Sequence, residues 1–95
     1  MSPAEVLEAL LALCREVPLE VRRVRGSPEG ADEPPARSGV CRVRGALWLV
    51  LSEADDLEER IDAAADALRR FAPALVESRY LPPAVRLRLA PPGAS

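Results

Sequence analysis

Four arginines stand at alternating positions in two short segments, each of which ends in a glycine: Arg23 and Arg25 in one, Arg42 and Arg44 in the other. Residues two apart in a strand share a face, so each pair would present two guanidinium groups to the same side of a sheet. Guanidinium groups bind phosphate and carboxylate through paired hydrogen bonds. If the two strands are neighbours, these residues predict an anion-binding face. The alternative is a solvated sheet face whose arginines pair with nearby carboxylates such as Glu20.

Nucleic acid is not the partner that this pattern favours. The chain carries 13 basic and 15 acidic residues, a net charge of −2, which gives no general attraction to a polyanion. RNA-binding sheets also place aromatic rings among their charges. Only Trp48 could serve here, and it lies in the most apolar segment of the chain.

Several kinds of catalysis are excluded by the residue types that are missing. The 95 residues include no His, Lys, Asn, Gln or Thr. Without histidine, a single chain has no Ser-His-Asp triad, Cys-His pair or HExxH zinc site. Without lysine, it has no Schiff base or phosphate-loop lysine. We therefore expect no catalytic residue and no cofactor.

The remaining acids and thiols have structural explanations. Six carboxylates crowd residues 53–62, where they complement the positive end of a helix dipole and lack the spacing of a metal-binding loop. Cys14 and Cys41 lie within apolar segments, so we expect buried thiols, with Cys41 facing the core; a disulfide between them is the alternative. No metal site is predicted.

Hydrophobic periodicity divides the chain into a helix, a strand, a hairpin, a second helix and a C-terminal extension. The first helix starts with Ser2 as N-cap and Glu5 completing a capping box, and Pro18 stops it. The second starts with Ser52 as N-cap and ends before Pro73. The other predicted segments are an edge strand (19–25), a flexible loop (26–38), a hairpin turning at Gly45-Ala46 (39–51), a helix or strand (82–89) and a disordered tail (91–95).

These segments predict one α+β domain over residues 1–90. Two long helices would cover one face of a small sheet of three, or at most four, strands. Residues 47–51 are apolar on both faces, so this strand should be central. The other face of the sheet is left with little to cover it.

The order helix, strand, hairpin and alanine-rich helix over residues 19–72 resembles the minimal zincin layout of the ImmA/IrrE-type metallopeptidases. In that family the helix carries the sequence AHELGH. The matching stretch here is ADALRR at 65–70, in which only Ala65 and Leu68 agree. The resemblance implies a scaffold that has lost both zinc ligands and the catalytic glutamate, so no catalytic residue is carried over.

The leading functional hypothesis is a non-catalytic interaction or structural domain of a bacterial cytoplasm, either a homodimer or bound to an unknown protein partner. Trp48 on the uncovered sheet face and the segment Tyr80-Leu81-Pro82-Pro83 are the predicted interface. We find neither a signal peptide nor a run of 18 apolar residues, so we expect a chain that does not insert into a membrane. The two alternatives are anion or nucleic-acid binding through the four strand arginines, and an inactive zincin-like relic.

Overall fold

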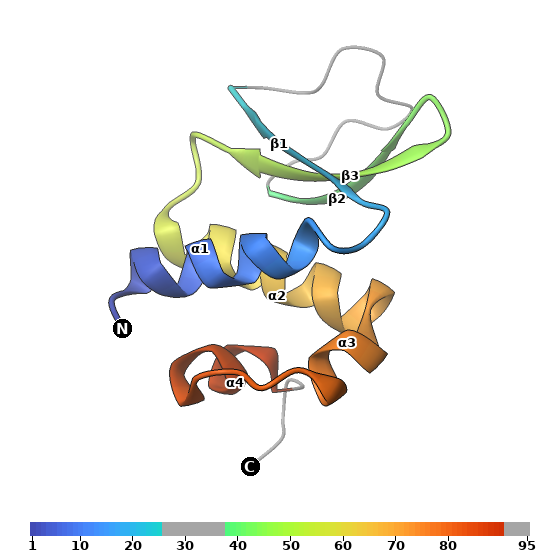
Figure 1. Cartoon of the computed structure of the whole chain (residues 1–95). Helices are drawn as coiled ribbons and strands as arrows, with labels where there is room; N and C mark the ends of the chain where they lie inside the picture. Colours follow the sequence, from blue (N-terminus) through green and yellow to red (C-terminus); the bar gives the residue numbers. More distant parts are fainter. Residues whose placement is uncertain (26–37, 91–95) are drawn as a thin grey trace.

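The computed structural model describes residues 1–25 and 38–90. Within them the chain forms an α+β fold with a mixed sheet (Figure 1). The elements follow one another as α1 (Pro3–Cys14), β1 (Glu20–Val24), β2 (Gly39–Val43), β3 (Ala46–Ser52), α2 (Leu57–Phe71), α3 (Pro73–Ser78) and α4 (Pro83–Leu89). The segment 82–89, for which the sequence allowed either a helix or a strand, thus forms helix α4. Most of the predicted loop and all of the predicted tail lie outside the described residues.

Helix α1 begins as its sequence predicts. The Ser2 side chain accepts a hydrogen bond from the Glu5 amide, and the Glu5 carboxylate accepts one from the Ser2 amide, which completes the capping box. The helix ends at Cys14, earlier than the predicted stop at Pro18. A residue before proline is pushed out of the α region, so the last turn before Pro18 is made by tighter bonds, from the Glu16 amide to the Leu13 carbonyl and from Val17 to Cys14.

The sheet has the strand order β1-β3-β2, with β1 parallel and β2 antiparallel to β3. The prediction that the two-sided apolar strand is central is confirmed, and so is the prediction that the first strand lies at an edge. Side chains alternate along β3: Leu49 and Leu51 enter the core beneath the helices, whereas Trp48 and Val50 face the other way.

The hairpin turn is shifted by one residue from its predicted place. Val43 pairs with Ala46, so the two turn residues are Arg44 and Gly45, with φ angles of 51° and 83°. Two successive positive φ angles are typical of a type I′ turn, whose twist matches that of the flanking strands. Glycine adopts this geometry without strain at the second position. The predicted pair Gly45-Ala46 was wrong because Ala46 already belongs to the ladder.

Helix α2 begins at Leu57, four residues after the predicted start. Its N-cap is Asp56, whose carboxylate accepts a hydrogen bond from the Glu59 amide at 2.9 Å. The predicted cap, Ser52, is instead the last residue of β3, and its amide donates to the Ser38 hydroxyl at 2.8 Å. The predicted end of the helix is confirmed: Phe71 is its last residue, and Pro73 starts α3.

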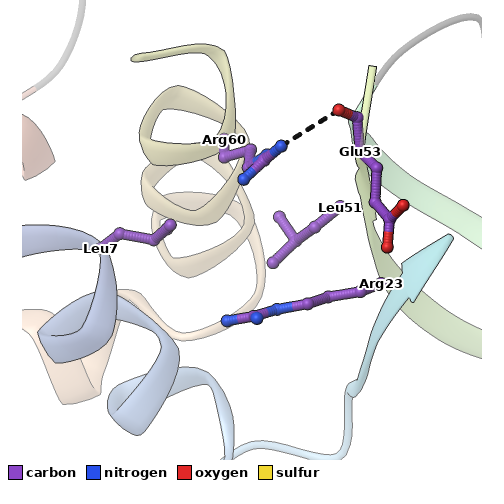
Figure 2. A pocket seen from close by; sticks show the side chains of 5 residues that line it. All are labelled: Leu7, Arg23, Leu51, Glu53 and Arg60. Carbon is purple, nitrogen blue, oxygen red and sulfur yellow. Dashed lines mark hydrogen bonds between the residues drawn. The ribbon is translucent and has the colours of Figure 1, made fainter. Parts of the chain in front are cut away.

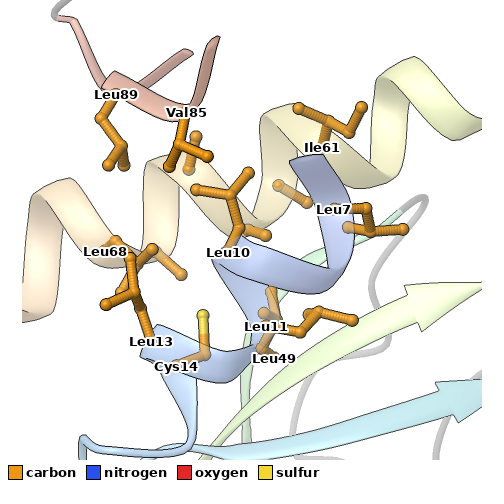
Figure 3. Packing of buried hydrophobic residues seen from close by; sticks show 14 of the residues in the cluster. Leu7, Leu10, Leu11, Leu13, Cys14, Leu49, Ile61, Leu68, Val85 and Leu89 are labelled. Atoms are coloured by element: carbon orange, nitrogen blue, oxygen red, sulfur yellow. The ribbon is translucent and has the colours of Figure 1, made fainter. Parts of the chain in front are cut away.

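The core lies between the sheet and the helices. Helices α1 and α2 cover one face of the sheet, and α4 packs on the side of the helices that is away from the sheet (Figure 1). Leu10 and Leu68 meet between α1 and α2, and Val85 and Leu89 reach them from α4 (Figure 3). Helix α2 contributes four small buried side chains, which bring its backbone close to its neighbours: Ala63, Ala64, Ala65 and Ala67.

Helices α3 and α4 are attached differently from α1 and α2. Helix α3 has no fully buried residue, although Leu75 and Val76 pack against the core. Its C-cap, Arg79, forms a bidentate pair with Glu16, which follows α1. The hydrogen bonds from Arg79 lower the pKa of Glu16. Leu81, Val85 and Leu89 anchor the segment in the core. Tyr80, directly before Leu81, is 86% exposed.

Candidate functional sites

The four strand arginines are not brought together. Strand β3 lies between β1 and β2, which separates these two strands by about 9–10 Å. Arg23 pairs in register with Leu51 and Arg42 with Leu47, four residues away along β3, a further separation of about 13 Å. Arg44 lies in the turn. The condition for a shared anion-binding face, that the two arginine strands are neighbours, is therefore not met.

Three of these four arginines have local contacts. The Arg23 guanidinium lies 3.6 Å from the Glu8 carboxylate, and Arg25 pairs with Glu53 at 3.1 Å. Arg42 donates to the carbonyl of Gly45 at 3.3 Å, within its own hairpin. Arg23 differs from the others because it lies on the helix-facing side of β1, where it lines a cleft.

This cleft, which we call the carboxyl-edge cleft, lies where the parallel strands β1 and β3 both end. It has a volume of about 370 Å³ and is lined by Leu7, Arg23, Leu51, Glu53 and Arg60 (Figure 2). In α/β sheets, ligands bind at the carboxyl ends of parallel strands, because loops and helix starts converge there. The start of α2 and the first turns of α1 close the sides of this cleft.

A set of hydrogen bonds fastens the sheet at this edge. Ser38, predicted to belong to the flexible loop, is buried; its amide donates to the Asp55 carboxylate at 2.6 Å, and its hydroxyl accepts from the Ser52 amide. The chain entering β2 is thereby tied to the chain leaving β3. Asp55 acts as a tether between segments, and this explains one of the acids that the sequence assigned to the dipole of α2.

Arg60 is the cleft residue that the sequence gave no reason to single out. Its Nε donates to the Ser52 carbonyl and its Nη2 to the Glu53 carbonyl, each at 3.2 Å. These bonds orient the guanidinium without neutralising it. Figure 2 shows Arg60 and Arg23 entering from α2 and β1, with Leu51 between them. The sequence feature that could have indicated Arg60 is its position in the first turn of a helix that follows the central strand.

The sheet face around Trp48 is less open than the sequence suggests. The Trp48 ring is half-buried, and the Arg22 guanidinium lies 5.1 Å from its centroid, in a cation–π contact. Val50 on the same face is fully buried. Cys41 pairs with Trp48 in register, so it faces away from the helices, which corrects the expectation that it faces the core.

The predicted C-terminal interface segment is split between core and surface. Leu81 is buried, whereas Tyr80, Pro82 and Pro83 are exposed. Beside it runs an open apolar groove of about 530 Å³ between the end of α2, α3 and α4. We call it the α3–α4 groove; its lining comprises Arg69, Pro73, Val76, Glu77, Arg86, Leu89 and Ala90. Strand β3, which carries Trp48, and helix α4, which follows Tyr80 in the chain, lie on opposite sides of the α1–α2 layer (Figure 1).

The thiols and acids of the described residues form no metal site or disulfide. No group of three or more His, Cys, Asp or Glu side chains in residues 1–25 and 38–90 could hold a metal ion. Cys14 and Cys41 are not joined. Burial raises the pKa of the Cys14 thiol to about 11, so it is protonated at neutral pH.

Two polar residues of the stretch that resembles the zincin active-site helix, Asp66 and Arg70, are not directed into a cleft. Asp66 pairs with Arg69 and Arg70 at 3.6 Å in each case, and the side chains of Asp66 and Arg70 are both more than half exposed. Neither lines the carboxyl-edge cleft or the α3–α4 groove. This placement lends the resemblance no support.

Comparison of the chain with protein-family models, with curated proteins and with solved structures found no match. Across residues 1–25 and 38–90, no helix has both the length and the apolar character needed to cross a bilayer.

Proposed function

We propose that this chain is a non-catalytic interaction domain that self-associates through its C-terminal face. The observation that carries the proposal is the exposure of Tyr80 (86%), which lies between α3 and α4, and of Leu87 (75%), which lies on α4. These are the two most exposed large apolar side chains of the described residues. A bacterial cytoplasmic setting, as the sequence predicts, belongs to the same proposal.

The composition of this face suits protein binding. Val76 and Leu89 give the groove an apolar floor, and Arg69, Glu77 and Arg86 give it a charged rim. An apolar centre with a polar rim is the usual anatomy of a protein interface. Tyr80 is also among the residue types that dominate binding energy, because its ring buries a large area with little loss of conformational freedom.

A second copy of the chain is the partner that this face fits best. In a two-fold dimer, the same patch meets itself, so a protruding group on one protomer must find its complement on the other. Tyr80 and Leu87 are exposed in the same C-terminal part of the chain whose helices α3 and α4 form the apolar groove. Glu77 and Arg86 carry opposite charges on the rim of that groove, and neither has an ion-pair partner among the described residues.

The sheet face around Trp48 is the weaker candidate for self-association. Its aromatic ring is half-buried and already covered by Arg22, so a partner would gain less apolar contact there. The exposed apolar groups of the C-terminal face have no such cover. For this reason we place the dimer contact at α3 and α4.

The test is sedimentation equilibrium from micromolar to millimolar protein. We expect the natural chain to form a dimer and the Tyr80→Ser/Leu87→Ser variant to stay monomeric. Trp48→Leu is the matched control on the sheet face and should dimerise normally. Circular dichroism of each variant would show that the fold is kept. A monomeric natural chain, or loss of the dimer in Trp48→Leu alone, would overturn the proposal.

A charge exchange tests the two-fold arrangement. Glu77→Arg and Arg86→Glu should each weaken the dimer, because each places like charges across the interface. The double exchange Glu77→Arg/Arg86→Glu should restore it. If the double variant is as weak as the two single changes combined, these residues do not face each other across the contact.

A further inference from the structure

We propose that the carboxyl-edge cleft binds a small organic anion, one with a phosphoryl or carboxylate head and a short apolar portion. Arg60 and Arg23 would bind the head, and Leu7 and Leu51 would contact the apolar portion. This site shares no lining residue with the α3–α4 groove and does not depend on the proposed dimer.

Arg60 carries the inference, because it is a half-buried charge with no counterion among the described residues. Both of its hydrogen-bond acceptors are main-chain carbonyls, and the nearby Glu53 carboxylate is turned to Arg25 at 3.1 Å. Charged side chains removed from water are ordinarily paired with an opposite charge. An anion in the cleft would supply that charge.

The Arg60 guanidinium is also held in one orientation before any ligand binds. Its Nε and Nη2 are fixed by the carbonyls of Ser52 and Glu53, which leaves Nη1 without a hydrogen bond among the described residues. A guanidinium held in place before binding loses little conformational freedom when the ligand arrives. The contacts with the ends of β3 thus make Arg60 a rigid donor.

Arg23, the second arginine of the cleft, is held more weakly than Arg60. Its only partner among the described residues is Glu8, at 3.6 Å, and both side chains are well exposed. Such a pair contributes little to stability, so an anion can draw Arg23 away from Glu8 at small cost. Arg23 and Arg60 approach the cleft from opposite sides (Figure 2), an arrangement suited to an anion with several acceptor oxygens.

Two acids near the cleft accept hydrogen bonds from main-chain amides. Asp55 accepts from the Ser38 amide, and Asp56 caps α2 through the Glu59 amide. Within residues 1–25 and 38–90, Asp56 forms no ion pair with Arg23 or Arg60. Among the charged residues that line the cleft, the two arginines outnumber the single acid, Glu53, although the net charge of the chain is negative.

The apolar wall sets the size of the ligand. Leu7 and Leu51 are almost completely buried in the core, so only small parts of them reach the cleft. A volume of about 370 Å³ is at the small end of ligand sites. We therefore expect a ligand with a short chain or a single ring beyond its anionic head.

The test is titration of isotope-labelled protein, followed by NMR, with inorganic phosphate, butyl phosphate and pentanoate. The amides of Leu7, Arg23, Leu51 and Arg60 should shift together, and butyl phosphate should bind more tightly than inorganic phosphate. Comparison of butyl phosphate with pentanoate, which carry similar chains, decides between the two heads. No shift at these residues with any probe, or equal binding of inorganic and butyl phosphate, would contradict the proposal.

Variants locate the site. Arg60→Gln and Arg23→Gln should each weaken butyl phosphate binding by about 10-fold or more, the loss of one charged donor pair. Arg70→Gln, an equal change of charge on the exposed side of α2, should leave it unchanged. Equal losses in all three would indicate non-specific attraction and overturn the site. The Tyr80→Ser/Leu87→Ser variant should bind as the natural chain does, whatever its oligomeric state.

Discussion

The carboxyl edge of the sheet and the C-terminal helices are fixed by different physical means. At the carboxyl edge, hydrogen bonds join segments far apart in the sequence: Ser38 binds Ser52 and Asp55, and Arg60 binds two carbonyls of the chain leaving β3. Hydrogen bonds are directional, so this edge can hold charged groups in fixed places.

The C-terminal helices combine burial with ion pairs: Arg79 pairs with Glu16, and Arg88 with Glu58. Leu81, Val85 and Leu89 enter the core, while α3 has no fully buried residue and Leu87 is directed outwards. Burial is not directional, and it leaves the opposite side of a short helix free to be apolar as well. The comparison teaches that hydrogen bonds fix the charged groups of the carboxyl edge in place, whereas the helices α3 and α4 keep their exposed side apolar.

The largest effect should come from removing the apolar anchor of α4. Leu89→Ala should lower the free energy of unfolding by about 2–5 kcal/mol, because it leaves a cavity in the core. Leu87→Ala, two positions away but exposed, should change it by less than about 0.5 kcal/mol. Urea unfolding of dilute, monomeric protein measures both. Similar losses in the two variants would show that α4 is not held by burial.

Alkaline pH should weaken the core that both ends share. Cys14 has a pKa of about 11 in the folded chain against an ordinary 9.0. The unfolded chain therefore loses this proton first, and stability falls as pH rises from about 9 to 11, by about 2–3 kcal/mol in total. Unfolding followed by Trp48 fluorescence for the sheet and by circular dichroism for the helices should show one common loss. The Cys14→Ala variant should lack this slope; if it keeps the slope, another group is responsible.

The smallest expected effect is a difference in stability between two serine variants, one at the carboxyl edge and one in α3. Ser38→Ala removes the hydroxyl that accepts from the Ser52 amide and should cost about 1–2 kcal/mol. Ser78→Ala removes only an exposed contact with the Leu75 carbonyl at 3.5 Å and should change stability by less than about 0.5 kcal/mol. Thermal unfolding of the two variants side by side gives the difference. Equal stability would mean that the carboxyl edge is not fastened by Ser38.

The sequence predicts those parts of the fold that depend on neighbouring residues. The capping box of Ser2 and Glu5 is complete within four residues, and the two-sided apolar run around Leu49 identifies the central strand without further information. Even where local signals competed, the misplacement was small: the hairpin turn is one residue earlier than expected, because Ala46 pairs with Val43.

The candidate sites depend on contacts between distant segments, which the sequence does not display. Ser52 has the residue type of a helix cap, but the Ser38 hydroxyl takes its amide and Asp56 becomes the cap. Arg23 and Arg42 have the spacing of a joint site, yet β3 lies between their strands. Arg60 was missed because its role depends on the main-chain carbonyls at the end of β3, which every residue carries alike.

The parallel pairing of β1 with β3 also bears on how the chain reaches its native state. Strands β2 and β3 are joined by a two-residue turn, so their ribbon can form within about 1–10 µs. Strand β1 pairs Glu20 with Trp48, which lies 28 positions further along the chain. The chain must therefore close a long loop before β1 forms its first hydrogen bonds with β3. We therefore expect the ribbon to nucleate the sheet and β1 to dock late, as the slowest element to find its place.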